Sequence, residues 1–252
     1  MKKVHFLASD SEPSQKALSM LLEKYPQEDP SSAEVYVAIG GDGFLLRALH
    51  MLPHSSQVYG INTGGVGFLL NKVETDLDKA LENPICVPLF PLTAEIQAGG
   101  NVYTEQAFND VSLTRSGSQA TEISVHVDSK MYLKKLVADG ILVSTPSGST
   151  GYNQSAGGPI LPLESNVLAL TPICAFSPRY WRGAILPDSA CIEFFVQNPD
   201  TRKAHVTLDF KEIKNVEKIT VKKDTTKRID LLFSPENSLK ERVFERQFLI
   251  QS

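Results

Sequence analysis

Residues 40–43 have a composition that suits anion binding and one side chain that opposes it. The four residues, Gly-Gly-Asp-Gly, follow a short β-branched run at 35–39 and precede apolar residues at helical spacing from 44 to 52. A glycine-rich turn between a strand and a helix lets backbone N–H groups gather round a phosphate group, and the helix dipole adds to the attraction. Asp42 would repel the same phosphate. Either the turn binds no phosphate, or Asp42 faces a different group.

Two further segments rich in glycine and hydroxyl groups favour a nucleotide site. They are TGGVG at 63–67 and DGILVSTPSGSTGYNQSAGGPI at 139–160, in which residues 147–150 can present hydroxyl and N–H groups to phosphate oxygens. None of the three segments contains a Walker A sequence or completes G-x-G-x-x-G, which disfavours a P-loop NTPase and an ordinary dinucleotide-binding dehydrogenase. An isolated SGST at 147–150 would more often be a surface turn.

The bulk composition excludes several classes of protein. In 252 residues, 25 Lys and Arg stand against 29 Asp and Glu, a formal net charge of −4. This balance gives no electrostatic basis for binding nucleic acid or a membrane surface. No apolar run approaches the length of a membrane span. The cysteines, Cys86, Cys174 and Cys191, are widely spaced without a metal-binding motif, which predicts a cytoplasmic protein.

The first part of the chain alternates between strand and helix patterns. Strands are expected at 3–8, 35–39 and 58–62, with helices after the first two and another over 74–82. Strands joined by helical crossovers form a parallel sheet, and ligands bind at the carboxyl ends of such strands. Both GGDG and TGGVG fall at that edge of the predicted sheet.

The second part of the chain has the alternating pattern of antiparallel strands. We expect an α/β domain over residues 1–86, joined by the terminal segment 226–252, and a β-rich, sandwich-like domain over 87–225. Near the end, Ser238 and Glu241 form a capping box, which predicts a final amphipathic helix with apolar residues up to Phe248.

The order of the motifs resembles that of the NAD kinases. GGDG after a strand, Asn109-Asp110, the long segment at 139–160 and LALTPICAFSPRYWRGAIL at 168–186 carry the resemblance, which spans roughly residues 35 to 190. It implies a Rossmann-like α/β domain and a β-rich domain, with the active site between them. It also implies phosphoryl transfer from ATP, with a divalent cation such as Mg²⁺, to the 2′-hydroxyl of the adenosine ribose of NAD, giving NADP. The partners implied are NAD, ATP and further copies of the chain in a homodimer or homotetramer.

The resemblance also implies a role for Asp42 that answers the question raised by GGDG. Asp42 is similar to the family's catalytic aspartate, which takes the proton of the ribose hydroxyl while the glycines admit the phosphates. The residues implied to bind NAD are Asp42, Gly43, Arg47, Asn109, Asp110, Asp139, Thr150, Gly151, Tyr152, Asn153, Ser155 and Cys174. Those implied to bind ATP or phosphate are Gly40, Gly41, Gly43, Gly64, Gly65, Ser147 and Ser149. The resemblance assigns no metal ligands.

Other interpretations of the same residues stay open at this point. Asp42 could simply cap the helix that follows it, since Asp is a favoured N-cap residue. Asp110 stands where the family more usually has Glu, and Gly151 where it has Ala, which puts the affinity for the substrate in question more than the reaction. The alternative functions are a lipid kinase of the diacylglycerol type, which shares GGDG, and a module that senses NAD without catalysis.

Overall fold

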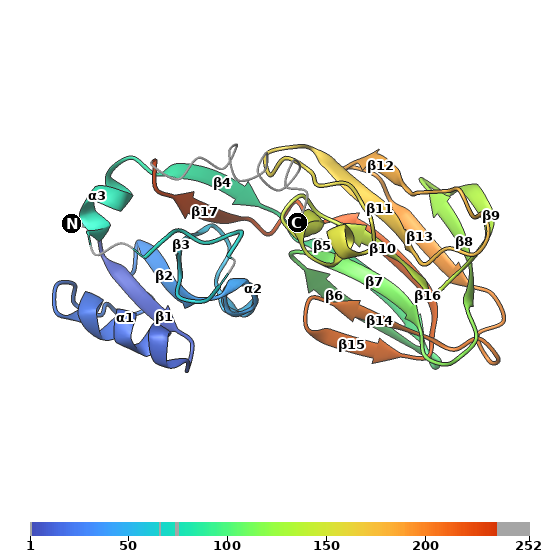
Figure 1. The fold of residues 1–252 in the computed structure, drawn as a ribbon, viewed down its shortest axis with the longest axis horizontal. Coiled ribbons are helices and arrows are strands. Elements are labelled where there is room, and N and C mark those ends of the chain that lie inside the picture. Colours follow the sequence, from blue (N-terminus) through green and yellow to red (C-terminus); the bar gives the residue numbers. More distant parts are fainter. Residues whose placement is uncertain (1, 66, 74–75, 236–252) are drawn as a thin grey trace. The chain divides into compact units, whose positions relative to one another are not determined.

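The computed structural model describes residues 2–65, 67–73 and 76–235. The chain forms two compact units (Figure 1). The first contains the chain up to Leu89 and the segment that begins at Thr226, and the second contains Phe90–Thr225. Each unit has its own buried core. The final helix expected from Ser238 to Phe248 lies outside the described residues.

A five-stranded sheet forms the centre of the first unit. Its strands, in spatial order, are β1 (Val4–Ala8), β2 (Val35–Gly40), β3 (Ser56–Asn62), β17 (Ile229–Phe233) and β4 (Ile85–Leu89). The pairs β1–β2, β2–β3 and β3–β17 are parallel, and β17–β4 is antiparallel. The helices of this unit are α1 (Glu12–Leu22), α2 (Asp42–Met51) and α3 (Leu77–Glu82). The predicted α/β pattern is therefore correct, and the three strands predicted from the sequence pair in parallel as expected. The edge strand β4 was not predicted and runs antiparallel to β17.

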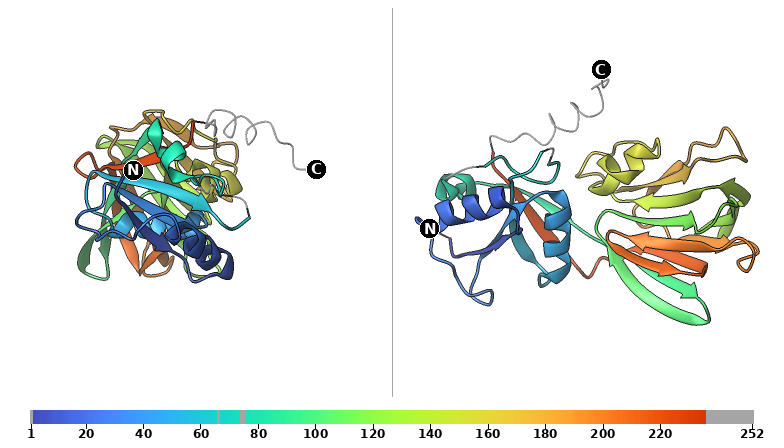
Figure 2. Two further views of the ribbon diagram at one scale, coloured as in Figure 1. Left: turned by 90° about the vertical axis from the view of Figure 1, so that its left-hand side faces the viewer. Right: turned by 60° about the horizontal axis from the view of Figure 1, so that its bottom comes forward.

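Burial follows the pattern that the sequence predicted for this unit. Every residue of β2 is buried, as expected for a central strand of a sheet covered on both faces. Helix α1 begins with Pro13 in its first turn and buries Ala17 and Leu21. It lies beside the sheet in Figure 2. Leu22, the last residue of this helix, is 42% exposed.

The second unit is a sandwich of two antiparallel sheets, as the alternating pattern predicted. One has the order β12 (Ala184–Pro187), β11 (Val167–Ile173), β10 (Gly140–Ser144), β7 (Asp110–Arg115), β14 (Ala204–Leu208), β15 (Lys211–Lys214). The other has the order β6 (Asn101–Ala107), β5 (Leu92–Ala98), β16 (Val216–Lys223), β13 (Ile192–Val196), β8 (Thr121–Val127), β9 (Lys130–Ala138). Two short helical segments, η1 (Gly148–Thr150) and α4 (Tyr152–Ser155), follow β10.

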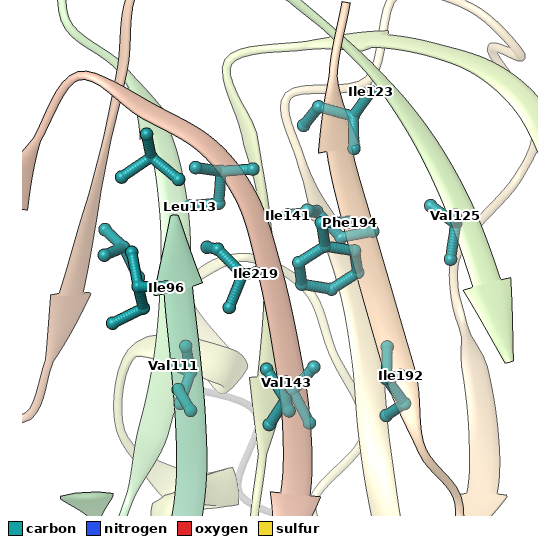
Figure 3. Packing of buried hydrophobic residues seen from close by; sticks show 14 of the residues in the cluster. Ile96, Val111, Leu113, Ile123, Val125, Ile141, Val143, Ile192, Phe194 and Ile219 are labelled. Atoms are coloured by element: carbon teal, nitrogen blue, oxygen red, sulfur yellow. The ribbon is translucent and has the colours of Figure 1, made fainter. Parts of the chain in front are cut away.

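The core of the sandwich is filled from both sheets. Ile141 and Val143 of β10 point inward from one sheet, and Ile192 and Phe194 of β13 from the other (Figure 3). All four side chains are fully buried. This core holds β10 in the middle of its sheet, and β10 leads directly into the long glycine- and hydroxyl-rich segment. In the part of the chain that the structure describes, no helix is long and apolar enough to cross a membrane.

Candidate active site

The two glycine-rich turns of the first unit lie side by side. Gly40 ends β2 and pairs in register with Asn62, which ends β3. The backbone N–H of Thr63 donates to the carbonyl oxygen of Gly40 at 3.1 Å. Because the two strands are parallel, both turns leave the same edge of the sheet, as the sequence predicted.

Asp42 does not cap helix α2. The N-cap residue is Gly41, and Asp42 is the first residue of the helix. Its carboxylate accepts two backbone hydrogen bonds from the segment after the second turn, from the N–H of Phe68 at 2.7 Å and from that of Leu69 at 3.1 Å. The helix-cap interpretation is therefore wrong, and the carboxylate ties the GGDG turn to the segment that follows β3.

The glycines of these turns differ in whether the surrounding atoms leave room for a side chain. A Cβ at Gly40 would lie 2.8 Å from a ring carbon of Phe44, so packing excludes a side chain there. A Cβ at Gly41, Gly43 or Gly65 would meet no atom within 4 Å, and none of these glycines has a left-handed φ. Neither packing nor backbone strain accounts for these three glycines.

The remaining predicted residues of the first unit are exposed. Gly64 is exposed, and an added Cβ there would make only an ordinary contact, 3.7 Å from the side-chain oxygen of Asn62. Arg47 is exposed on α2. At 3.6 residues per turn it lies about 140° round the helix from Asp42, so the helix does not place the two side chains on one face.

In the second unit, the segment after β10 packs against the link between β6 and β7. That link consists of Phe108 and Asn109. The Thr145 hydroxyl donates to the carbonyl oxygen of Phe108 at 2.6 Å, and the N–H of Thr145 donates to that of Asn109 at 2.9 Å. A Cβ at Gly148 would lie 2.3 Å from the carbonyl oxygen of Asn109, so only glycine permits this approach. The sequence pointed to Gly148 only as one of residues 147–150 that can face phosphate, and it did not point to Thr145.

The Asn109 side chain carries a buried oxygen atom, Oδ1. Among the described residues, none forms a hydrogen bond to this Oδ1 atom. A buried acceptor left unsatisfied costs about 1–3 kcal/mol. An amide oxygen in this state is a candidate for a ligand contact.

Two of the predicted residues, Asp110 and Tyr152, have raised pKa values. Burial raises the pKa of Asp110 to about 7, and the nearby charge of Asp209 contributes to the rise. Burial also raises the pKa of Tyr152, with further contributions from Asp110, Cys174 and Asp139. The Tyr152 side chain is nevertheless exposed. The fold thus places Asp110, Asp139 and Cys174, predicted from separate motifs, within electrostatic range of Tyr152.

The predicted residues of this unit are spread along β10. Asp110 pairs with Ser144 at the end of this strand, and Gly140, at its start, pairs with Ile173, which precedes Cys174. Gly140 and Ser144 are four residues apart, which corresponds to about 13 Å along an extended strand. At the Gly140 end, Asp139 forms an ion pair with Arg115, with 2.6 Å between Oδ1 and Nε. Cys174 is exposed there.

The structure gives Ser147, Ser149 and Asn153 internal roles that the sequence did not reveal. The Ser147 hydroxyl donates to the carbonyl oxygen of Phe108 at 2.9 Å, and the Ser149 hydroxyl donates to that of Pro146 at 2.7 Å. The Asn153 amide donates to the carbonyl oxygen of Pro159 at 2.8 Å. Its side-chain oxygen accepts from Thr171 at 2.6 Å.

All three of these side chains are buried. They shape the turn in this structure, whereas the sequence led us to expect ligand contacts from them. Thr150 is half-buried, and Gly151 and Ser155 are exposed.

Comparison with known proteins identifies the family. The model of the ATP-NAD kinase N-terminal domain matches residues 1–85, and that of the ATP-NAD kinase C-terminal domain matches residues 108–226. The chain belongs to the ATP-NAD kinase family. The NAD kinase of Xylella fastidiosa is 44% identical over 250 residues, which cover 98% of this chain and 96% of that protein. The NAD kinase of Rickettsia africae is 44% identical over 220 residues, 86% of each chain.

Solved structures of ATP-NAD kinase relatives share the fold. Yeast NADH kinase, in a structure with NADH, superposes with a TM-score of 0.86 at 20% identity and covers 100% of this chain and 89% of its own. An NAD kinase from Archaeoglobus fulgidus, in a structure with ATP, gives a TM-score of 0.75 at 23% identity and covers 98% of both chains. These likenesses agree with the α/β and β-rich architecture described above.

Proposed function

We propose that this chain transfers the terminal phosphoryl group of ATP to the 2′-hydroxyl of the adenosine ribose of NAD, giving NADP and ADP. The observation that carries the proposal is the match of both ATP-NAD kinase domain models, supported by relatives that are 44% identical over nearly the whole chain. None of the comparisons favours a lipid kinase or a non-catalytic NAD sensor.

The phosphates of ATP bind at the two glycine-rich turns of the first unit. Gly41, Gly43 and Gly65 support this placement, because the space beside each is open and nothing in the fold requires a glycine there. Backbone N–H groups at the start of α2 would then face the phosphates, and the helix dipole favours negative charge at that end.

Asp42 acts as the general base. As the 2′-oxygen forms its bond to the terminal phosphorus of ATP, the carboxylate takes the hydroxyl proton, and the bond from phosphorus to the bridging oxygen of ADP breaks. The N–H groups of Phe68 and Leu69 hold the carboxylate in one orientation. A positioned base contributes about 10²–10⁴-fold to the rate of such a transfer.

NAD binds along β10 of the second unit. The amide of Asn109 pairs with the adenine edge, which offers a donor to its unpartnered Oδ1, and Asp110 accepts from a ribose hydroxyl. Thr150, Gly151, Tyr152 and Ser155 line the same ligand. The roughly 13 Å between the two ends of β10 suits an extended dinucleotide, with Cys174 as a wall and Asp139 towards the nicotinamide. We do not extend this proposal to Asn153, Ser147 and Ser149.

The site suits a divalent cation that is bound together with the phosphates of ATP. The described residues contain no cluster of three His, Cys, Asp or Glu side chains that could hold a metal ion. Mg²⁺ usually keeps several waters and binds largely through the phosphates of its substrate, which leaves the Asp42 carboxylate to act as the base. Bound there, the cation would neutralise the charge that develops on the phosphates. We also expect a homodimer or homotetramer, and a cytoplasmic location, which suits the three free cysteines.

The test is incubation of the purified full chain with Mg-ATP and NAD, followed by detection of NADP with an NADP-specific dehydrogenase. A parallel reaction with labelled ATP and diacylglycerol vesicles tests the lipid alternative. The proposal predicts NADP in the first reaction and no labelled lipid in the second. Labelled lipid without NADP would refute it.

A further inference from the structure

The turn between β14 and β15 carries an aspartate that contacts the backbone beside Asn109. Asp209 has a φ of 52°, and its carboxylate accepts from the N–H of Phe108 at 2.8 Å and from the N–H of Asn109 at 2.9 Å. A left-handed φ is uncommon outside glycine, although Asp tolerates it better than most residues. The turn is held at this place because β14 pairs with β7, with Leu208 opposite Val111.

The carbonyl groups of the same two residues are held from the other side. The hydroxyl groups of Thr145 and Ser147 both donate to the carbonyl oxygen of Phe108. The backbone N–H of Thr145 donates to the carbonyl oxygen of Asn109. The backbone N–H groups and the carbonyl groups of Phe108 and Asn109 are thus all hydrogen-bonded within the protein. The Oδ1 atom of Asn109, by contrast, has no partner among the described residues. A backbone fixed this firmly beside an unsatisfied amide oxygen is suited to aiming that amide at a ligand.

We propose that Asp209 is a positioning residue for NAD, because its carboxylate fixes the peptide of Asn109 and so aims the side-chain amide at the adenine edge. This inference rests on the proposed function, in which Asn109 contacts NAD. Asp209 acts through Asn109 and does not itself touch the substrate.

Asp209 has a second effect on the site, through its charge. It adds to the burial that raises the pKa of the neighbouring Asp110 to about 7. Asp110 in turn contributes to the raised pKa of Tyr152 of α4. On the flanking strands, Lys211 of β15 is paired with Glu105 of β6. Removing the charge of Asp209 therefore lowers the pKa of Asp110.

The experiment compares the full-length Asp209→Asn and Asp209→Ala variants with the unaltered chain. Asparagine tolerates the left-handed turn but can accept only one of the two N–H bonds with its single oxygen. Losing one hydrogen bond to a charged group should raise the KM for NAD by about tenfold in Asp209→Asn, and by more in Asp209→Ala. The KM for ATP and kcat should change less than about twofold, because neither depends on this contact. Any inflection near pH 7 in the pH profile of the KM for NAD should move to lower pH.

Asp128 offers a matched control in the same sandwich. It has a φ of 50° in the turn between β8 and β9, and its carboxylate accepts from the N–H of Cys191 at 2.9 Å. Asp128→Asn makes the same chemical change without touching the link at Asn109, and should leave the KM for NAD unchanged. A KM for NAD that stays constant in Asp209→Asn, or rises together with the KM for ATP, would overturn the inference.

Folding outcomes are also decisive. If Asp209→Ala does not fold, the Asp209→Asn variant alone decides. If neither folds while Asp128→Asn does, the role of Asp209 is structural and the inference is wrong.

An Asn109→Ala variant separates this inference from the proposed function. If that change leaves the KM for NAD unaltered, the proposed contact itself fails. If it raises the KM while Asp209→Asn does not, only the role of Asp209 fails. Because Asp209 acts through Asn109, Asp209→Asn should add less than about threefold in a chain that already carries Asn109→Ala. Full additivity of the two effects would contradict the inference.

Discussion

Replacing Asp42 by asparagine tests the base and the structural tie in one variant. In this fold the carboxylate accepts from two backbone N–H groups, those of Phe68 and Leu69. Asparagine can accept from one of them with its oxygen, but its amide nitrogen would face the other. Losing one such bond at this half-buried position costs about 1–2 kcal/mol, and we expect a melting temperature a few degrees lower.

The expected effect on catalysis is larger than this structural effect. Loss of a positioned base should lower kcat by about 10²–10⁴-fold, which corresponds to roughly 2.7–5.4 kcal/mol. The structural loss alone, at about 2 kcal/mol, could weaken binding by no more than roughly 30-fold. The two effects are separable because the first falls on kcat and the second on the dissociation constants of ATP and NAD.

The assay measures kcat, the two dissociation constants and the melting temperature of Asp42→Asn. Asp76→Asn is the control, since the Asp76 carboxylate accepts from the N–H of Lys79 at the start of α3 and lies outside the proposed site. Asparagine is an equally good N-cap, so this control should keep both stability and turnover. Turnover of Asp42→Asn within tenfold of normal would refute the base. So would a loss that appears only as weaker ATP and NAD binding.

Three further substitutions test other parts of the site. Asn109→Ala should weaken NAD binding by about 1–3 kcal/mol without unfolding the chain, as measured by titration calorimetry, and unchanged affinity would make Asn109 a simple link residue. Gly41→Ala should fold normally, since the added methyl meets no atom within 4 Å, but should raise the KM for ATP at least about tenfold by crowding the phosphates. Gly117→Ala, which is equally open, is its control, and equal KM values in the two variants would refute the phosphate turn. Asp110 has a pKa raised from 3.8 to about 7, so its burial destabilises the folded chain progressively as pH rises through that interval. Asp110→Asn should therefore gain on the order of 4 kcal/mol over the unaltered chain at pH 8 and little at pH 4, as measured by urea unfolding, and a gain independent of pH would contradict this.

Local patterns in the sequence predicted the elements that carry the site. The β-branched run at 35–39 and the helical spacing after it indicated β2 and α2, and the alternation after residue 87 indicated the sandwich. These signals are local because burial of one face imposes a period of 2 or 3.6 on the residues of a single element.

The partners of individual polar groups could not be predicted in this way. Asp42 bonds to residues 26 and 27 positions away, and Asp209 to residues about 100 positions away. No local pattern records such distant contacts. A serine that builds a turn, such as Ser149, has the same sequence signature as one that faces phosphate. For Asp209, the only signal is an Asp-Phe pair between two alternating runs, which predicts a turn and nothing about its contact with Asn109.

The position of β17 has a consequence for how the chain is made. This strand comes from residues 229–233, yet it lies between β3 and β4, whose residues are among the first 89. During synthesis the ribosome releases the whole sandwich, residues 90–225, before it releases the strand that completes the first sheet. Until then β3 has only one of its two parallel neighbours, β2, and β4 lacks β17, the strand with which it pairs in the described structure. The nascent chain therefore cannot complete the sheet of the unit that holds Asp42 until residues 229–233 have emerged, so a ribosome that stalls within the sandwich leaves that sheet incomplete.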